Sequence, residues 1–117
     1  MLIQVSFIQL DHNKAPLAQT DQEAFVGRSV SLDLETEWFD TRLLPREKRQ
    51  IRYKAAVKSP AKWLHVEVKV KPDEFYRRFY LARLKDLELN QGRLWLTEAL
   101  KQAQVNEYLL WERDLLL

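Results

Sequence analysis

The sequence contains no cysteine, only two glycines and only two histidines. The absence of cysteine excludes disulfides, thiolate metal sites and a cysteine nucleophile. Two glycines are too few for a glycine-rich phosphate-binding loop, so neither a P-loop nor a dinucleotide-binding fingerprint can be built. The histidines and carboxylates form no recognisable catalytic or metal-ligand motif. We therefore predict that the protein is not an enzyme and binds no cofactor and no metal.

Long apolar runs are also missing. The first residues, Met1 to Phe7, alternate between apolar and polar side chains. They lack the basic start, the apolar stretch and the cleavage site of a signal peptide. The longest apolar runs fall far short of the roughly 20 residues needed to cross a bilayer. We therefore expect a cytoplasmic protein without a membrane span.

What the sequence does contain is typical of a globular protein. Its 117 residues are 46% apolar and 31% charged. This composition suits one hydrophobic core and is too apolar for a disordered chain. We expect a single α+β domain that covers residues 1–117.

Four segments show the alternation of apolar and polar residues that is typical of half-buried strands. They cover residues 2–10, 30–38, 51–58 and 62–71. Because consecutive strands usually pair, we predict a four-stranded antiparallel meander sheet. Two interpretations remain open before the second strand. Either Thr20 starts a short helical turn that ends at Gly27, or the second strand begins near Phe25 with Gly27 at a bulge.

Two amphipathic helices follow the predicted sheet. The first opens at Pro72, where proline and the acidic residues after it suit a helix N-terminus. A turn at residues 90–92 separates it from a second helical pattern, which starts at Arg93 and is interrupted at Asn106. Residues 108–117 fit either a continuing helix or a short strand. We expect both helices to pack on one face of the sheet, which gives two layers around one core.

The net charge of +2 hides an uneven distribution along the chain. Residues 1–41 hold two basic and seven acidic side chains, residues 42–72 hold ten and two, and residues 73–117 hold seven and eight. The outward positions of the second predicted strand are acidic and those of the third are basic. These positions are Asp33, Glu35 and Glu37 on the one strand and Arg52, Lys54 and Lys58 on the other. We expect them to pair across the strands, which would neutralise much of the basic segment.

The connection from Phe39 to Gln50 carries the cations that this pairing does not use. It contains Leu43 and Leu44 together with four basic residues, Arg42, Arg46, Lys48 and Arg49. Because loops are normally polar, two leucines beside four cations indicate a contact site. The alternative is that the leucines fold back and plug one end of the sheet.

The C-terminal segment, residues 108–117, presents a similar choice. It carries more apolar surface than one helix face can bury against one sheet. Either it wraps over the open core as a tail, or it forms a dimer or partner interface, because large apolar patches rarely stay exposed without a function.

The same basic segment also suits a nucleic acid. Its four loop cations could contact phosphates, and Trp63 could stack on a base. No helix-turn-helix, zinc-finger or RNA-binding sequence motif accompanies them. His65 stands beside Glu67 and, in the predicted sheet, near Asp33 or Glu35. An exposed histidine among charges is far more often ordinary surface than a catalytic base.

These observations predict a small non-enzymatic protein-interaction or assembly module. Its partner is another protein or a second copy of itself, as a homodimer. The alternative is a nucleic-acid-binding domain that uses the basic segment 42–63. The candidate contact residues are Phe39, Arg42, Leu43, Leu44, Arg46, Lys48, Arg49, Trp63, Trp111 and Leu115.

Overall fold

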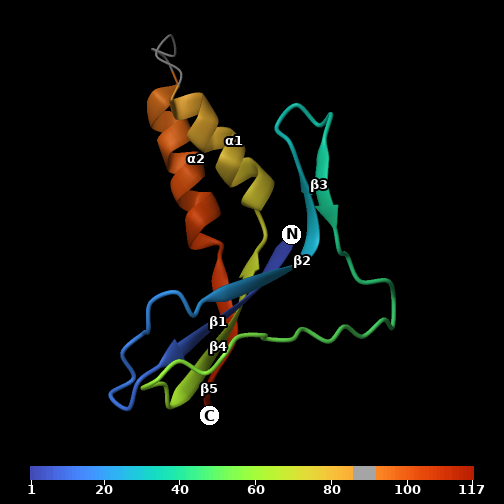
Figure 1. The fold of residues 1–117 in the computed structure, drawn as a ribbon. Helices are drawn as coiled ribbons and strands as arrows, with labels where there is room; N and C mark the ends of the chain where they lie inside the picture. The colour runs from blue at the N-terminus through green and yellow to red at the C-terminus, as the bar shows by residue number, and fades with distance from the viewer. Residues whose placement is uncertain (86–91) are drawn as a thin grey trace.

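The computed structural model describes residues 1–85 and 92–117 (Figure 1). It contains one five-stranded antiparallel sheet and two helices, so the α+β class is confirmed. The elements are β1 (Leu2–Leu10), β2 (Gln22–Val30), β3 (Glu37–Asp40), β4 (Trp63–Lys71), α1 (Glu74–Leu84), α2 (Arg93–Val105) and β5 (Tyr108–Leu116). The strands lie in the order β3-β2-β1-β4-β5. The sheet is therefore not a meander of four consecutive strands, because β4 pairs with β1 and not with β3, and a fifth strand, β5, joins it after the helices.

The two central strands, β1 and β4, form the core of the sheet, as their alternation predicts. Phe7 lies directly opposite Val66 in an antiparallel register. Because side chains alternate between the two faces of a strand, this register gathers the apolar positions on one face. The buried cluster on that face consists of Val5, Phe7, Leu64 and Val66.

Residues 51–58, which the alternation predicts to be a strand, join no ladder. They form an extended strap that crosses the apolar face of the sheet (Figure 1). Ile51 and Tyr53 pack on the buried cluster. Gln9, which is fully buried, holds the strap through bonds to Tyr53 Oη, Ala56 O and Lys58 N at 2.8 to 2.9 Å. The alternation therefore reflects the one-sided burial of the strap. The backbone of the strap is bound by the side chain of Gln9 and not by a neighbouring strand.

The second predicted strand is misplaced in the sequence analysis. Residues 31–36 form a turn between β2 and β3, in which the Asp33 carboxylate accepts bonds from Ser31 and from the amide of Glu35. Leu34 has a positive φ of 63° there. The interpretation with a strand beginning near Phe25 is the better one, because β2 covers that region. Gly27 has a φ of +146°, and β2 changes its pairing partner from β1 to β3 just after it.

The two helices form a hairpin inserted between β4 and β5. They stand beyond one end of the sheet and pack on one another (Figure 1). The prediction that they cover a face of the sheet is therefore wrong. The reason is that α1 follows β4 after Pro72 and Asp73, and α2 leads directly into β5, which ties both helices to the same end of the sheet. The strap occupies the apolar face instead.

The expected starts of both helices are confirmed, because α1 begins close to Pro72 and α2 begins at Arg93 and ends at Val105, just before Asn106. Of the two alternatives for residues 108–117, the strand is the one observed, as β5. The expected turn at residues 90–92 lies largely outside the described residues. Neither described helix is long and apolar enough to span a bilayer.

Candidate interaction surface

Strand β5 forms one edge of the sheet, so it has a backbone partner only on the β4 side. Every residue of β5 except Asp114 is exposed. The exposed apolar side chains of β5 and the residue after it are Tyr108, Leu109, Leu110, Trp111, Leu115, Leu116 and Leu117. An uncovered apolar edge strand is unusual, because natural proteins normally shorten, charge or cover such edges. We call this surface the β5 edge.

Three of the predicted contact residues lie at or beside the β5 edge. Trp111 stands opposite Val68 and is 47% exposed, and Leu115 stands opposite Leu64 and is 40% exposed. Trp63 lies on β4, where the ammonium groups of Lys14 and Lys62 approach its ring to 5.0 and 5.9 Å. Trp63 is half-buried, so it offers only part of its ring for contact.

The other seven predicted contact residues lie at the opposite edge of the sheet, on or after β3. Phe39 stacks on Phe25 with ring centroids 5.9 Å apart. Leu43 borders an open hollow of about 440 Å³ beside Ile3 and Val26. Leu44 is 72% exposed, so it does not plug the sheet. The ten residues therefore form two separate surfaces, one at each edge of the sheet.

Two loop cations are paired within the loop itself. Arg42 binds Asp40 through two bonds of 2.9 and 2.6 Å, and this guanidinium lowers the pKa of the Asp40 carboxyl to about 2. Arg49 contacts Glu47 at 3.1 Å and donates to the carbonyl of Thr41. Both acids of the loop are thus paired with arginines of the loop, and Arg46 and Lys48 form no ion pair with the described residues.

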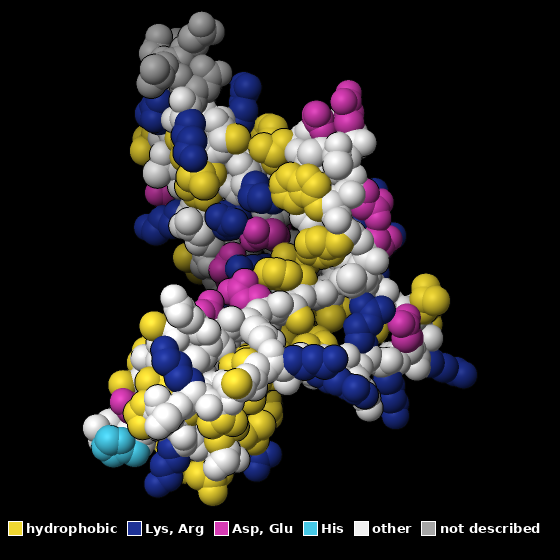
Figure 2. Space-filling view, viewed as in Figure 1, with side chains coloured by type: hydrophobic (Ala, Val, Ile, Leu, Met, Phe, Trp, Pro, Cys, Tyr) yellow, Lys and Arg dark blue, Asp and Glu magenta, His cyan; other side chains and the backbone are white. Residues whose placement is uncertain are grey.

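The expected pairing between acidic and basic strands is wrong. Within the described part of the chain, no ion pair joins Asp33, Glu35 or Glu37 to the strap. Glu37 instead pairs with Arg28 at 3.3 Å. The reason is that the acids lie on the β2–β3 turn and at the start of β3, whereas the cations lie on the strap, which pairs with no strand. Figure 2 shows Lys and Arg side chains gathered along the loop and strap on the right of the view.

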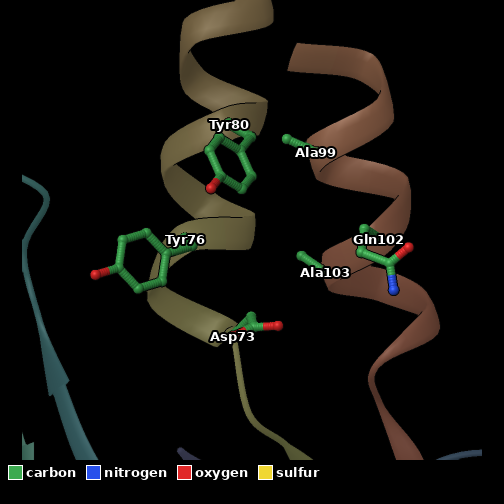
Figure 3. A pocket seen from close by; sticks show the side chains of 6 residues that line it. All are labelled: Asp73, Tyr76, Tyr80, Ala99, Gln102 and Ala103. Carbon is green, nitrogen blue, oxygen red and sulfur yellow. The ribbon is translucent and has the colours of Figure 1, made fainter. Parts of the chain in front are cut away.

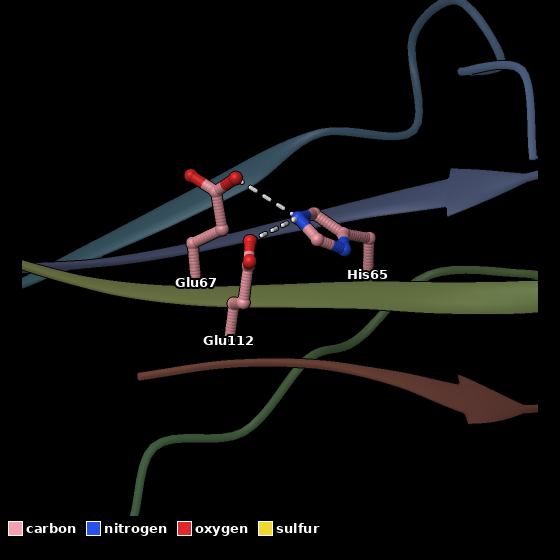
Figure 4. Close-up of side chains that lie close together, drawn as sticks. All are labelled: His65, Glu67 and Glu112. Atoms are coloured by element: carbon pink, nitrogen blue, oxygen red, sulfur yellow. Dashed lines mark hydrogen bonds and ion pairs between the residues drawn. The ribbon is translucent and has the colours of Figure 1, made fainter. Parts of the chain in front are cut away.

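A cluster of titratable groups lies on the other face of the sheet, where β4 meets β5 (Figure 4). The Nε2 atom of His65 is 2.9 Å from Glu67 Oε1 and 3.8 Å from Glu112 Oε2, and Nδ1 is 2.5 Å from Asp114 Oδ1. Hydrogen bonds that the His65 ring donates to the carboxylates of Glu67 and Asp114 raise the pKa of His65, and they lower the pKa of both carboxyls.

The prediction that Asp33 or Glu35 lies near His65 is wrong. Glu112 and Asp114 of β5 occupy those positions. The alternation of Glu112 and Asp114 on either side of Arg113 was the available signal, but it could be used only once β5 was known to be a strand beside β4. This His65 cluster is the one group of described residues with the ligand types and spacing to hold a metal ion.

An open groove of about 410 Å³ lies between the two helices (Figure 3). Tyr76 and Tyr80 come from α1, and Ala99 and Ala103 come from α2. Tyr76 is 56% exposed, whereas Tyr80 is half-buried and its ring contacts Trp95 of α2. This groove is not predicted from the sequence, because the apolar residues of both helices are expected there to lie against the sheet.

No protein-family model, no curated protein and no solved structure matches this chain. The geometry of its edges and clusters is therefore the basis for assigning a function.

Proposed function

We propose that the protein is a non-enzymatic assembly module that associates with a second copy of itself through the β5 edge. The observation that carries the proposal is the exposure of seven apolar side chains on and just after an edge strand. Burial of apolar surface is the main force in protein association. Addition of a strand to an open sheet edge supplies backbone hydrogen bonds as well.

The exposed area of the chain supports an interface. A folded monomer of 14.0 kDa exposes about 6,700 Å². This chain exposes 8790 Å², a surplus of about 2,000 Å² over that scaling. A standard interface removes about 800 Å² from each partner. The surplus is thus large enough for one stable interface.

A second copy is the occupant that the edge fits best. Two β5 strands related by a two-fold axis perpendicular to the sheet would run antiparallel and join both sheets into one. The same operation places the apolar side chains of each β5 against those of the other. Asp114 of β5 does not oppose this approach, because His65 and Lys14 already contact it at 2.5 and 3.0 Å.

The test is the oligomeric state of the wild type and of a double variant, Leu110→Lys with Trp111→Lys, measured by sedimentation equilibrium over a wide concentration range. Both side chains are exposed, so lysine should not disturb the fold, and edge lysines discourage strand pairing. The matched control is Leu94→Lys with Trp95→Lys, which places the same two charges at exposed positions of α2.

We expect a dimer for the wild type and the control, and a monomer for the double variant, with similar circular dichroism spectra for all three. A wild type that stays monomeric at every concentration would contradict the proposal. A double variant that remains dimeric would contradict the choice of the β5 edge.

Nucleic-acid binding is the second candidate, and one observation favours it. The cations of the loop and strap are not neutralised by the acidic residues of the β2–β3 turn, contrary to the sequence-based expectation. Cations along an extended segment could follow a phosphate backbone. Against this candidate, Trp63 lies beside the opposite edge of the sheet, so the loop cations have no stacking partner in it.

The salt dependence of binding distinguishes this candidate. Fluorescence anisotropy with single-stranded DNA should show affinity that falls steeply with ionic strength if phosphates are contacted. Lys48→Glu with Arg52→Glu should then abolish binding, whereas the same charge reversal at Lys101 of α2 should not. Affinity that does not depend on ionic strength, or that the Lys48 and Arg52 variant retains, would exclude nucleic-acid binding by the loop and strap.

A further inference from the structure

We propose that His65, Glu67 and Glu112 form a binding site for a divalent transition-metal ion of the zinc type, which joins β5 to β4. This inference goes beyond self-association and does not depend on it. The three residues come from two neighbouring strands and face one another on the same side of the sheet (Figure 4).

The spacing of the ligand atoms suits a metal of this size. One nitrogen of His65 and one oxygen of each glutamate lie within 4.8 Å of one another. Zinc bonds of about 2.0 to 2.2 Å place tetrahedral ligands about 3.4 Å apart. The distances from His65 Nε2, 2.9 Å to Glu67 and 3.8 Å to Glu112, lie on either side of that value. Small side-chain rotations would bring both to it.

The orientation of His65 is the second observation. Asp114 holds Nδ1 at 2.5 Å, which turns Nε2 toward the two glutamates. Lys14 fixes Asp114 in turn at 3.0 Å. Metal-binding histidines are usually oriented in this way, with the second ring nitrogen bonded to a carboxylate. Asp114 is thus a positioning residue.

The register of the strands supplies the third observation. Glu67 and Glu112 are directly opposite partners in the β4–β5 ladder. Like charges in this relation destabilise a sheet unless a cation lies between them. The space between these carboxylates is where His65 Nε2 points (Figure 4). A divalent ion there would offset both negative charges and would bind the edge strand to its neighbour.

The ligand types and the surroundings define the class of ion. One imidazole and two carboxylates suit zinc, cobalt or manganese, whereas magnesium and calcium prefer oxygen ligands alone. An open hollow of about 180 Å³ adjoins the cluster, lined in part by Ser6, Glu23 and Glu67. This hollow gives an ion and a coordinated water access to the site.

The test is isothermal titration of the full chain with zinc chloride at neutral pH, with magnesium chloride as the comparison ion. The chain has only two histidines, so His12, on the exposed β1–β2 loop, provides the matched control. The variants are His65→Gln, Glu112→Gln, Asp114→Asn and His12→Gln. In parallel, the imidazole nitrogens of the two histidines are followed by NMR during the titration.

We expect one equivalent of zinc to bind the wild type and the His12→Gln variant. Loss of a ligand at His65 or Glu112 should weaken binding by more than loss of Asp114, for which about 10- to 100-fold is expected. The Nε2 signal of His65, and not that of His12, should shift with zinc. Because Glu112 is exposed, Glu112→Gln should keep its circular dichroism spectrum.

Three results would overturn the proposal. The first is the absence of saturable zinc binding. The second is equal binding by all variants, which would indicate an adventitious ion only. The third is a His65 signal that responds to pH but not to zinc, which would show that the cluster holds a proton and no metal.

Discussion

A single polar side chain, Gln9, stabilises the attachment of the strap to the sheet, although its place in the sequence does not indicate this role. It lies in β1 among apolar neighbours and has no exposed surface. Its amide donates to Tyr53 and Ala56 and accepts from the backbone of Lys58, while its own backbone N–H donates to Thr20 Oγ1 at 3.1 Å. Buried polar groups are tolerated when all their bonds are made. Gln9 therefore connects the strap to the sheet.

Replacement of Gln9 by alanine should destabilise the protein by about 1 to 3 kcal/mol, because buried groups of the strap lose their partner. Urea unfolding measures the loss, and hydrogen exchange should show faster exchange at the Lys58 amide, which Gln9 binds. The control is Gln104→Ala, at an exposed position of α2. Equal stability of the two variants would show that Gln9 does not hold the strap.

Among the elements, α1 depends most on local electrostatics. Its described residues include no buried side chain. Glu74 at its first turn receives two bonds from Arg77, at 3.0 and 2.9 Å. The Arg77 guanidinium lowers the pKa of Glu74 below its ordinary value of 4.5. The carboxylate form of Glu74 is therefore the one that supports the start of the helix, where it also meets the positive end of the helix dipole.

Acid should remove this support. A carboxyl with a lowered pKa in the folded state contributes stability above its unfolded pKa, and this contribution disappears as the pH falls through the folded value. Wild type should therefore be more stable than Glu74→Gln at pH 7, and the difference should vanish well below pH 4.5. Urea unfolding followed by helical circular dichroism measures it. Glu98→Gln, an exposed change on α2, is the control, and a pH-independent difference for Glu74→Gln would refute the interpretation.

The sequence predicts an element best under either of two conditions. The first is that the element buries one side only, and the second is that its neighbour in sequence is also its neighbour in space. β1 and β4 satisfy the first condition, and α1 and α2 satisfy the second because they pack on one another. Residues 51–58 mislead because a strap over an apolar face alternates like a strand. β5 is ambiguous because its pairing with β4 is non-local and lies across the helical hairpin.

The candidate sites, too, are predictable where they depend on local sequence and not where they depend on the strand order. Exposure of Trp111, Leu43 and Leu44 is consistent with the composition of their segments. The separation of the ten contact residues onto two edges could not be predicted, because it depends on the strand order. The His65 cluster could not be predicted for the same reason, since two of its three carboxylates, Glu112 and Asp114, come from β5, whose pairing with β4 the sequence does not show.

At the scale of the whole molecule, the chain is more extended than its length requires. A compact chain of this length has a radius of gyration of about 13 Å. The Cα atoms here give 17.8 Å, with principal extents of 52 × 36 × 22 Å. The helical hairpin and the loop after β3 account for this, because both project from the sheet (Figure 1). Such a shape leaves many apolar side chains without cover within one chain.

Small-angle X-ray scattering should reveal this extended shape in a monomer. The double variant Leu110→Lys with Trp111→Lys, if monomeric, should have a radius of gyration at or above 17.8 Å. Folding of the helices back onto the sheet would instead give a value near 13 Å. That smaller value would show that the projecting hairpin is not the conformation in solution.

The strap also lies between two halves of the chain, although it packs over the core that both halves form. Together with the loop before it, the strap is the one connection between a first half, with β1, β2 and β3, and a second half, with β4, α1, α2 and β5. A protease such as trypsin, which cuts after basic residues in extended backbone, would find substrate at Lys48 and Arg49, in the loop just before the strap. The nicked halves would stay together through the ladder from Leu2 to Leu10. Two separately expressed fragments should therefore reconstitute the protein, with the β1–β4 pairing as the seam.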